Sequence, residues 1–220
     1  MSEVDGNKDQ VRLYVVGPIQ TCCYVYESQG ECLVVDPGSS GAALARELSD
    51  VRVTKIVATH GHSDHIAGVA ALKEATGAEF LMSEADAYRC SLAGADVDFI
   101  DAAQGDGDAP EPDVLLHEGD VVEVGTARFR VLETPGHTEG CIVLLGEGSA
   151  EGVCFTGDTL FAGSMGRVDL PGGDLETIIA SLRRLAAELP ADVAILPGHG
   201  PTSTMERELA TNEYLRHALM

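Results

Sequence analysis

The sequence contains no long apolar run. No stretch approaches the ~20 consecutive apolar residues that a membrane-spanning helix requires. Its first residues, Met1 to Gln10, are polar and acidic, and they lack the basic and apolar regions of a secretory signal. We therefore expect no membrane partner, and the expected location is the cytoplasm.

Basic residues are scarce. The chain has 220 residues, of which 14 are lysine or arginine and 36 are aspartate or glutamate, so the net charge is −22. Because this charge repels phosphate backbones, nucleic acid is not an expected partner. The expected partner is a small-molecule substrate, and nothing in the sequence indicates an oligomeric state.

The sequence also has no C-x-x-C pair, although it contains six cysteines. A zinc ribbon or a thioredoxin-like site is therefore not predicted. Cys32, Cys141 and Cys154 lie in apolar, strand-like runs, which is typical of small buried side chains in a reducing compartment. Cys22 and Cys23 are adjacent, so a strand would point them to opposite faces of its sheet.

The sequence does contain regular alternation of strands and helices. We expect strands at 11–16, 22–26, 31–35, 53–59, 78–82, 121–124, 127–133, 141–145, 153–156 and 193–196. We expect helices at 40–48, 66–76, 83–93, 174–188 and 203–219. Strands followed by helices occur twice, which predicts an α/β fold in which two halves face each other, with helices outside. The length suits a single domain over residues 1–220.

An acidic segment interrupts this pattern at 98–113. It contains prolines and glycines and has little periodicity, so we interpret it as a surface loop or a lid. An acidic insert without a role is the alternative.

Five of the seven histidines follow expected strands and lie in glycine-bearing turns. Strand ends are where loops converge on active sites, and neutral imidazole is a common metal ligand. His117 and His217 lie outside such turns, and we expect them to be ordinary polar side chains. The five candidate ligands are His60, His62, His65, His137 and His199.

The spacing of these candidates suggests how they divide. An extended His60-Gly61-His62 segment would send both rings to one side, where they could clamp one ion. Asp64 and His65 follow as the chain turns into a helix, and they could reach a second ion. The remaining donors come from later turns, namely His137, Asp158 and His199.

The run from Thr59 to His65 reads T-H-x-H-x-D-H, and it resembles the metallo-β-lactamase-fold superfamily over about 11–200. The resemblance implies a four-layer αβ/βα sandwich. It also implies that one metal is bound by His60, His62 and His137, that a second is bound by Asp64, His65 and His199, and that Asp158 bridges the two.

Within that superfamily, the stretch 155–174 resembles the glyoxalase II-like branch, the hydroxyacylglutathione hydrolases and their short relatives. This resemblance implies a dinuclear metal-dependent hydrolase of acyl-thioesters such as S-lactoylglutathione. A metal-bridging hydroxide would attack the carbonyl, and Asp64 would be catalytic by orienting it. Zn²⁺ is the first expectation for both ions, and iron or manganese suits the same donors. Full-length members carry a basic C-terminal extension, whereas the end of this sequence offers only Arg207 and Arg216.

Three questions stay open on the sequence alone. Arg167 is a candidate substrate-binding residue for an anionic group, or it pairs with Asp169. A persulfide (sulfur) dioxygenase with mononuclear iron is an alternative activity, although all ligands for a second metal are present. A lactonase is a further alternative, because the same metal pair can serve several bonds.

Overall fold

The computed structural model describes residues 9–91 and 109–220, which form two six-stranded sheets and a small hairpin. The first sheet consists of β1 (Gln10–Val16), β2 (Thr21–Ser28), β3 (Glu31–Val35), β4 (Arg52–Ala58), β5 (Glu79–Ser83) and β6 (Val114–Leu116), in that order. The second consists of β14 (Ser203–Thr204), β13 (Ala194–Pro197), β10 (Val153–Gly157), β9 (Ile142–Gly148), β8 (Ala127–Glu133) and β7 (Val121–Val124). Strands β11 (Leu160–Phe161) and β12 (Ser164–Met165) form the hairpin.

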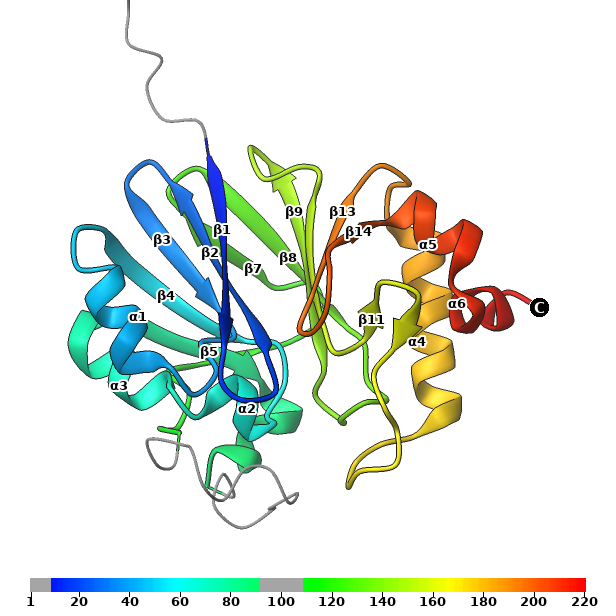
Figure 1. Cartoon of the computed structure of the whole chain (residues 1–220), viewed down its shortest axis with the longest axis horizontal. Coiled ribbons are helices and arrows are strands. Elements are labelled where there is room, and N and C mark those ends of the chain that lie inside the picture. The colour runs from blue at the N-terminus through cyan, green and yellow to red at the C-terminus, as the bar shows by residue number, and fades with distance from the viewer. Residues whose placement is uncertain (1–8, 92–108) are drawn as a thin grey trace, which may run out of the picture.

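The two sheets face each other, and helices cover their outer sides (Figure 1). Helices α1 (Gly41–Glu47), α2 (Ser63–Ile66) and α3 (Val69–Thr76) accompany the first sheet, and α4 (Leu175–Glu188), α5 (Met205–Thr211) and α6 (Glu213–Ala218) accompany the second. The four-layer αβ/βα sandwich is therefore confirmed. Within the described residues, no helix is long and apolar enough to cross a membrane.

Three apolar cores separate these layers. Alternation along β2 places Cys23 in the core beneath α1 and α3, and Cys22 in the core between the sheets, as the sequence predicted. Phe129 and Phe155 fill the centre of the inter-sheet core. Leu182 of α4 belongs to the third core, which lies on the outer side of the second sheet. Each sheet is thus apolar on both faces, which is typical of a layer in the interior of a sandwich.

The prediction of one helix at 66–76 is wrong in its extent. Two helices lie in this region, because α2 begins at Ser63 and α3 begins only at Val69. Gly68 lies against the turn before α1, where its backbone N–H donates to the carbonyl of Gly38. A side chain at Gly68 would lie 2.5 Å from the backbone nitrogen of Gly41, so glycine is needed for this approach.

The helix expected at 203–219 is also wrong. Residues 203–204 form strand β14, and the helical part divides at Asn212. The Asn212 side chain accepts hydrogen bonds from the backbone N–H groups of Tyr214 and Leu215, so it caps α6 rather than continuing α5. The expected helix at 174–188 is confirmed, and Asp174 caps it by accepting from Thr177 N at 2.7 Å.

The segment after β5 also differs from expectation. It forms a 3₁₀ helix, η1 (Glu84–Ser91), instead of an α-helix, and the expected end at 92–93 lies outside the described residues. Most of the acidic segment, 98–108, lies outside them as well. Its described part, 109–113, leads into β6, a strand that the sequence did not predict. The other strands missed are β11, β12 and β14, each of two residues.

The metal-ligand candidates lie on the segments that follow β4, β8, β10 and β13, and Asp64 and His65 belong to α2. Backbone hydrogen bonds hold these segments together, both between the two sheets and within the second sheet. Ile142 N donates to Thr59 O at 2.8 Å, Gly198 N donates to Gly157 O at 2.8 Å, and Cys22 N donates to Gly198 O at 2.7 Å. The loops therefore meet at one end of the sandwich.

Candidate metal centre

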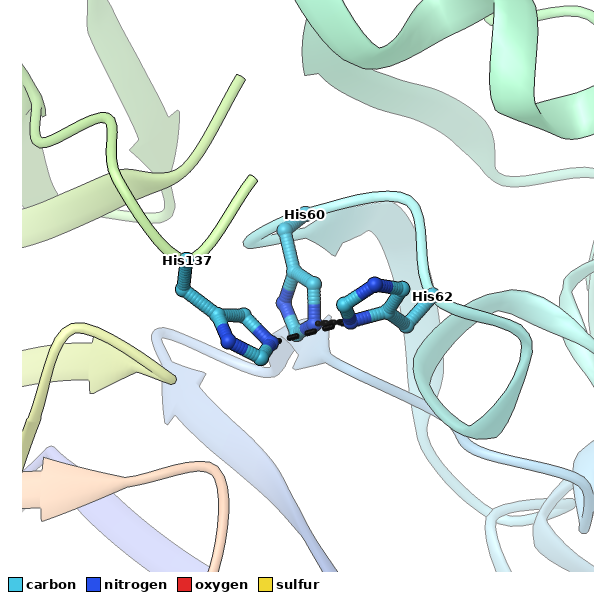
Figure 2. A group of neighbouring side chains, drawn as sticks. All are labelled: His60, His62 and His137. Carbon is cyan, nitrogen blue, oxygen red and sulfur yellow. Dashed lines mark hydrogen bonds between the residues drawn. The ribbon is translucent and has the colours of Figure 1, made fainter. Parts of the chain in front are cut away.

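Three histidines form the first group, His60, His62 and His137. Figure 2 shows their rings converging from two loops, with the ring nitrogens turned toward one another. His60 Nε2 lies 3.0 Å from His62 Nδ1, and His62 Nδ1 lies 2.9 Å from His137 Nε2. Three nitrogens this close together could each be a ligand of one cation.

The hydrogen bonds behind these rings fix two of the tautomers. Thr59 Oγ1 donates to Asp36 Oδ2 at 2.8 Å, so it accepts from His60 Nδ1 at 3.2 Å. His137 Nδ1 donates to the Arg167 carbonyl at 2.7 Å. Both Nε2 atoms therefore present lone pairs to the centre, and His62 Nδ1 can donate to only one of them. A cation satisfies all three nitrogens at once, as metal-binding histidines with supported rings usually require.

Burial keeps the imidazoles of His60 and His62 uncharged. It lowers the pKa of His62 to about 3 and holds the pKa of His60 well below its usual value. Nearby imidazoles lower both values further. The neutral form is the one that binds metal, so the group is ready for a cation at neutral pH.

The second group consists of Asp64, His65 and His199. Asp64 Oδ2 lies 3.2 Å from His65 Nε2 and 3.2 Å from His199 Nε2. Burial favours the neutral acid, but the two imidazoles outweigh it and hold the pKa of Asp64 well below its usual range. One carboxylate and two imidazoles are again a common metal-ligand set.

Asp158 lies between the two groups. Its Oδ1 is 3.5 Å from His65 Nε2, and its Oδ2 is 3.5 Å from His137 Nε2 and 3.6 Å from His199 Nε2. Oδ1 is buried and has no hydrogen-bond partner, and burial raises the pKa of this carboxyl group. A buried carboxylate oxygen without a donor is costly unless a cation is bound. The residues present therefore fit a pair of divalent cations.

The structure thus brings all seven candidate ligands into one cluster. Arg167 contributes its carbonyl to His137, while its side chain is 60% exposed and pairs with Asp169 at 2.7 and 2.8 Å. The ion pair anticipated for Arg167 is therefore present, and its role toward a substrate stays a prediction. His117 and His217 lie apart from the cluster and are exposed, as expected.

Two residues that support the centre were not identified from the sequence. Asp36 is 1% exposed, accepts from Thr59 N at 2.7 Å, and lies 3.0 Å from His65 Nδ1. Thr21 Oγ1 donates to Asp64 Oδ2 at 2.8 Å. Asp36 comes directly after β3, and this place after a strand is the signal that the candidate ligands share.

Known proteins resemble this chain along most of its length. The sequence profile of the Metallo-beta-lactamase superfamily matches residues 16–199. Hydroxyacylglutathione hydrolase GloC of Haemophilus influenzae is 32% identical over 204 residues, covering 89% of this chain and 92% of that protein. A hydroxyacylglutathione hydrolase of Cereibacter sphaeroides is 41% identical over 189 residues, covering 84% of this chain but 64% of that protein.

Solved structures agree in fold. TTHA1623 in a di-iron-bound form has a TM-score of 0.80 and 32% identity, covering 92% of this chain and 99% of that one. ETHE1 from Myxococcus xanthus has a TM-score of 0.74 and 27% identity, covering 93% of this chain and 83% of that one. The resemblance drawn from residues 59–65 is confirmed, and the chain belongs to the metallo-β-lactamase superfamily.

Proposed function

We propose that this protein is a dinuclear metal-dependent hydrolase that cleaves acyl-thioesters such as S-lactoylglutathione. The observation that carries the proposal is the position of Asp158, whose carboxylate touches both histidine groups. This arrangement supports two cations held together rather than one. Zn²⁺ is the first candidate, and iron or manganese suits the same donors.

The seven side chains have distinct tasks in this proposal. His60, His62 and His137 would hold one cation, Asp64, His65 and His199 would hold the other, and Asp158 would contact both. When bound, the cations would supply Lewis acidity that activates water and polarises the scissile carbonyl. Asp64 is fixed by Thr21 and by two imidazoles, so we assign it the orientation of the attacking water in addition to metal binding.

Two observations support the proposed substrate class, namely the relatives and the place of Arg167, whose carbonyl contacts His137. GloC, which bears the name of a hydroxyacylglutathione hydrolase, aligns over nearly its whole length with this chain. The basic extension expected of longer family members is therefore not required for a protein of that name. Arg167 is the proposed contact for an anionic substrate group, because exposed pairs such as Arg167–Asp169 contribute only about 0–1 kcal/mol and can exchange partners.

A second candidate function rests on a different grouping of the same residues. His60, His65 and Asp158 also lie within 4.8 Å of one another through their donor atoms. Two histidines and one carboxylate are the set that binds non-haem iron in oxygenases. This grouping is what a persulfide dioxygenase with mononuclear iron would use, and His62, Asp64, His137 and His199 would then be left without a metal.

One experiment separates these activities. Purified protein is loaded in turn with Zn²⁺, Mn²⁺ or Fe²⁺, and its metal content is measured. Each form is then assayed for thiol release from S-lactoylglutathione and other acyl-thioesters, for lactone opening, and for oxygen uptake with glutathione persulfide. We expect two metal equivalents and thiol release. One iron with oxygen uptake would establish the dioxygenase, and lactone opening with intact thioesters would reject the proposed substrate class.

A further inference from the structure

A buried aspartate outside the seven ligands binds both loops of the first histidine group. Asp86 lies in η1 and is 0% exposed. Its Oδ2 accepts from Gly61 N and from Thr138 Oγ1, each at 2.7 Å. Its Oδ1 accepts from Gly140 N at 2.8 Å. Three donors thus satisfy one carboxylate, which offsets the cost of burying it.

Two of these donors neighbour metal-ligand candidates directly. Gly61 separates His60 from His62, and Thr138 follows His137. One carboxylate therefore joins the loop that carries two histidines of the first group to the loop that carries the third. We propose that Asp86 is a positioning residue, which sets the spacing of the three imidazoles and so the affinity of the first metal site.

Arg89 extends this connection to a third segment. It is 4% exposed, and its Nε lies 3.4 Å from Asp86 Oδ1, so it supplies a countercharge to the buried carboxylate. Its guanidinium donates to Glu139 Oε2 at 2.8 Å and to the Pro171 carbonyl at 2.9 Å. Pro171 belongs to the same segment as Arg167, whose carbonyl fixes the His137 ring.

The contact leaves no space for a longer side chain. A Cβ atom at Gly61 would lie 2.7 Å from Arg89 Cβ, and a Cβ atom at Gly140 would lie 2.6 Å from Asp86 Cβ. Gly61 and Gly140 therefore both pack directly against η1. The spacing of the two loops depends on the length of the aspartate side chain and on its ability to accept from three donors.

Asp86→Asn tests this role with little change in shape. An asparagine offers one oxygen in place of two, and its NH₂ group would face a backbone N–H or a hydroxyl that also donates. The inference rests on the proposed metal centre but not on the substrate. We therefore measure zinc affinity by competition with a chromophoric chelator, and thioester hydrolysis only afterwards.

We expect one of the two zinc equivalents to bind about 10–100-fold more weakly in Asp86→Asn. Glu208→Gln is the matched control. Glu208 lies on α5, is 0% exposed and accepts from Gly163 N at 2.7 Å, but its partners lie on β14, at Asn212 between α5 and α6, and in the β11–β12 hairpin. It should lose thermal stability to a similar degree while both zinc affinities stay within about twofold of wild type.

Thr138→Val keeps the test decisive if Asp86→Asn does not fold. It removes one donor to Asp86 and should weaken the same zinc equivalent by a smaller factor. The proposal is overturned if a folded variant binds both equivalents as wild type does, or if Glu208→Gln weakens zinc as much as Asp86→Asn. If wild type itself binds no zinc, manganese or iron, the metal centre and this inference with it are rejected.

Discussion

At the scale of the residue, hydrogen bonds on the outer side of the cluster fix the orientation of the candidate ligands. The Nδ1 atoms of His60 and His137 are occupied by Thr59 and by the Arg167 carbonyl, which leaves their Nε2 atoms as acceptors. Thr21 fixes Asp64 in the same way. Asp158 is the exception, because one of its buried oxygens has no donor. Asp158 should therefore favour metal binding and disfavour folding of the metal-free protein.

Asp158→Asn tests that opposition. With a neutral side chain between the two groups, the metal content should fall from two equivalents to one or fewer, as measured by elemental analysis. The metal-free variant should be more stable than metal-free wild type by about 1 kcal/mol, because a buried carboxylate oxygen without a hydrogen-bond donor is removed. Urea unfolding in the presence of a chelator measures this difference.

Asp169→Asn is the control for the change of charge. Asp169 is exposed and lies in the segment that follows Asp158. The ion pair described above joins it to Arg167, which is not a candidate ligand. Its substitution should leave metal content unchanged. If metal-free Asp158→Asn is instead less stable than wild type, the carboxylate is satisfied without a cation and the fit to a metal pair is weakened.

At the scale of the element, helix boundaries depend on contacts that no local pattern encodes. Propensity predicted one helix from Ile66 to Thr76, since alanine and leucine dominate there. The chain instead starts its helix at Ser63 and interrupts it at Gly68, where it meets the turn before α1. Asn212 divides the last helix because its side chain caps α6 and donates to the β11–β12 hairpin.

Gly68→Ala distinguishes the effect of backbone entropy from that of the close backbone contact, because the two predict changes in stability of opposite sign. Gly68 has φ −89° and ψ −3°, which alanine adopts easily, so backbone entropy alone predicts stabilisation by about 0.4–1 kcal/mol. The added Cβ would lie 2.5 Å from Gly41 N and 2.7 Å from Gly38 O, and backbone atoms cannot move aside. We expect destabilisation by about 1–3 kcal/mol in urea unfolding. A more stable variant would contradict the close approach.

At the scale of the whole molecule, the ligand loops join two halves that are distant in the chain. Strand β4 of the first sheet precedes the ligand candidates from His60 to His65. Strands of the second sheet precede His137, Asp158 and His199. A cation bound by ligands from both sheets would bind the folded state and not the unfolded chain. Metal binding should therefore add to the stability of the whole sandwich.

Metal removal measures that contribution. At a free zinc concentration ~1,000 times the Kd, linkage adds about 4 kcal/mol to the free energy of unfolding. For a domain of this size, that corresponds to a fall in Tm of about 10 °C when a chelator removes the metal. Calorimetry with EDTA, and with zinc-saturated EDTA as the control, checks this. Equal Tm values in the two would indicate that the ligands contribute nothing to holding the sheets together.

The sequence by itself determined the type of fold and indicated the candidate ligands. Histidines and aspartates in glycine-bearing turns after strands identified all seven residues that the structure brings together, because both signals are local. The alternation that divides Cys22 from Cys23 is equally local, and it predicted that their side chains lie on opposite faces of the sheet. The single domain over 1–220 stays a prediction, as do the roles of the ligands.

Only the tertiary structure decided which residues support those ligands. Asp36 and Thr59 are 23 positions apart, Thr21 and Asp64 are 43 apart, and Asp86 and Thr138 are 52 apart. No spacing rule connects such pairs. The first two contacts arise where β2, β3 and β4 lie side by side in the first sheet, and the third arises when the two sheets pack face to face. The same packing placed Asp158 between the two histidine groups, which turned a list of candidate ligands into one cluster that fits two cations.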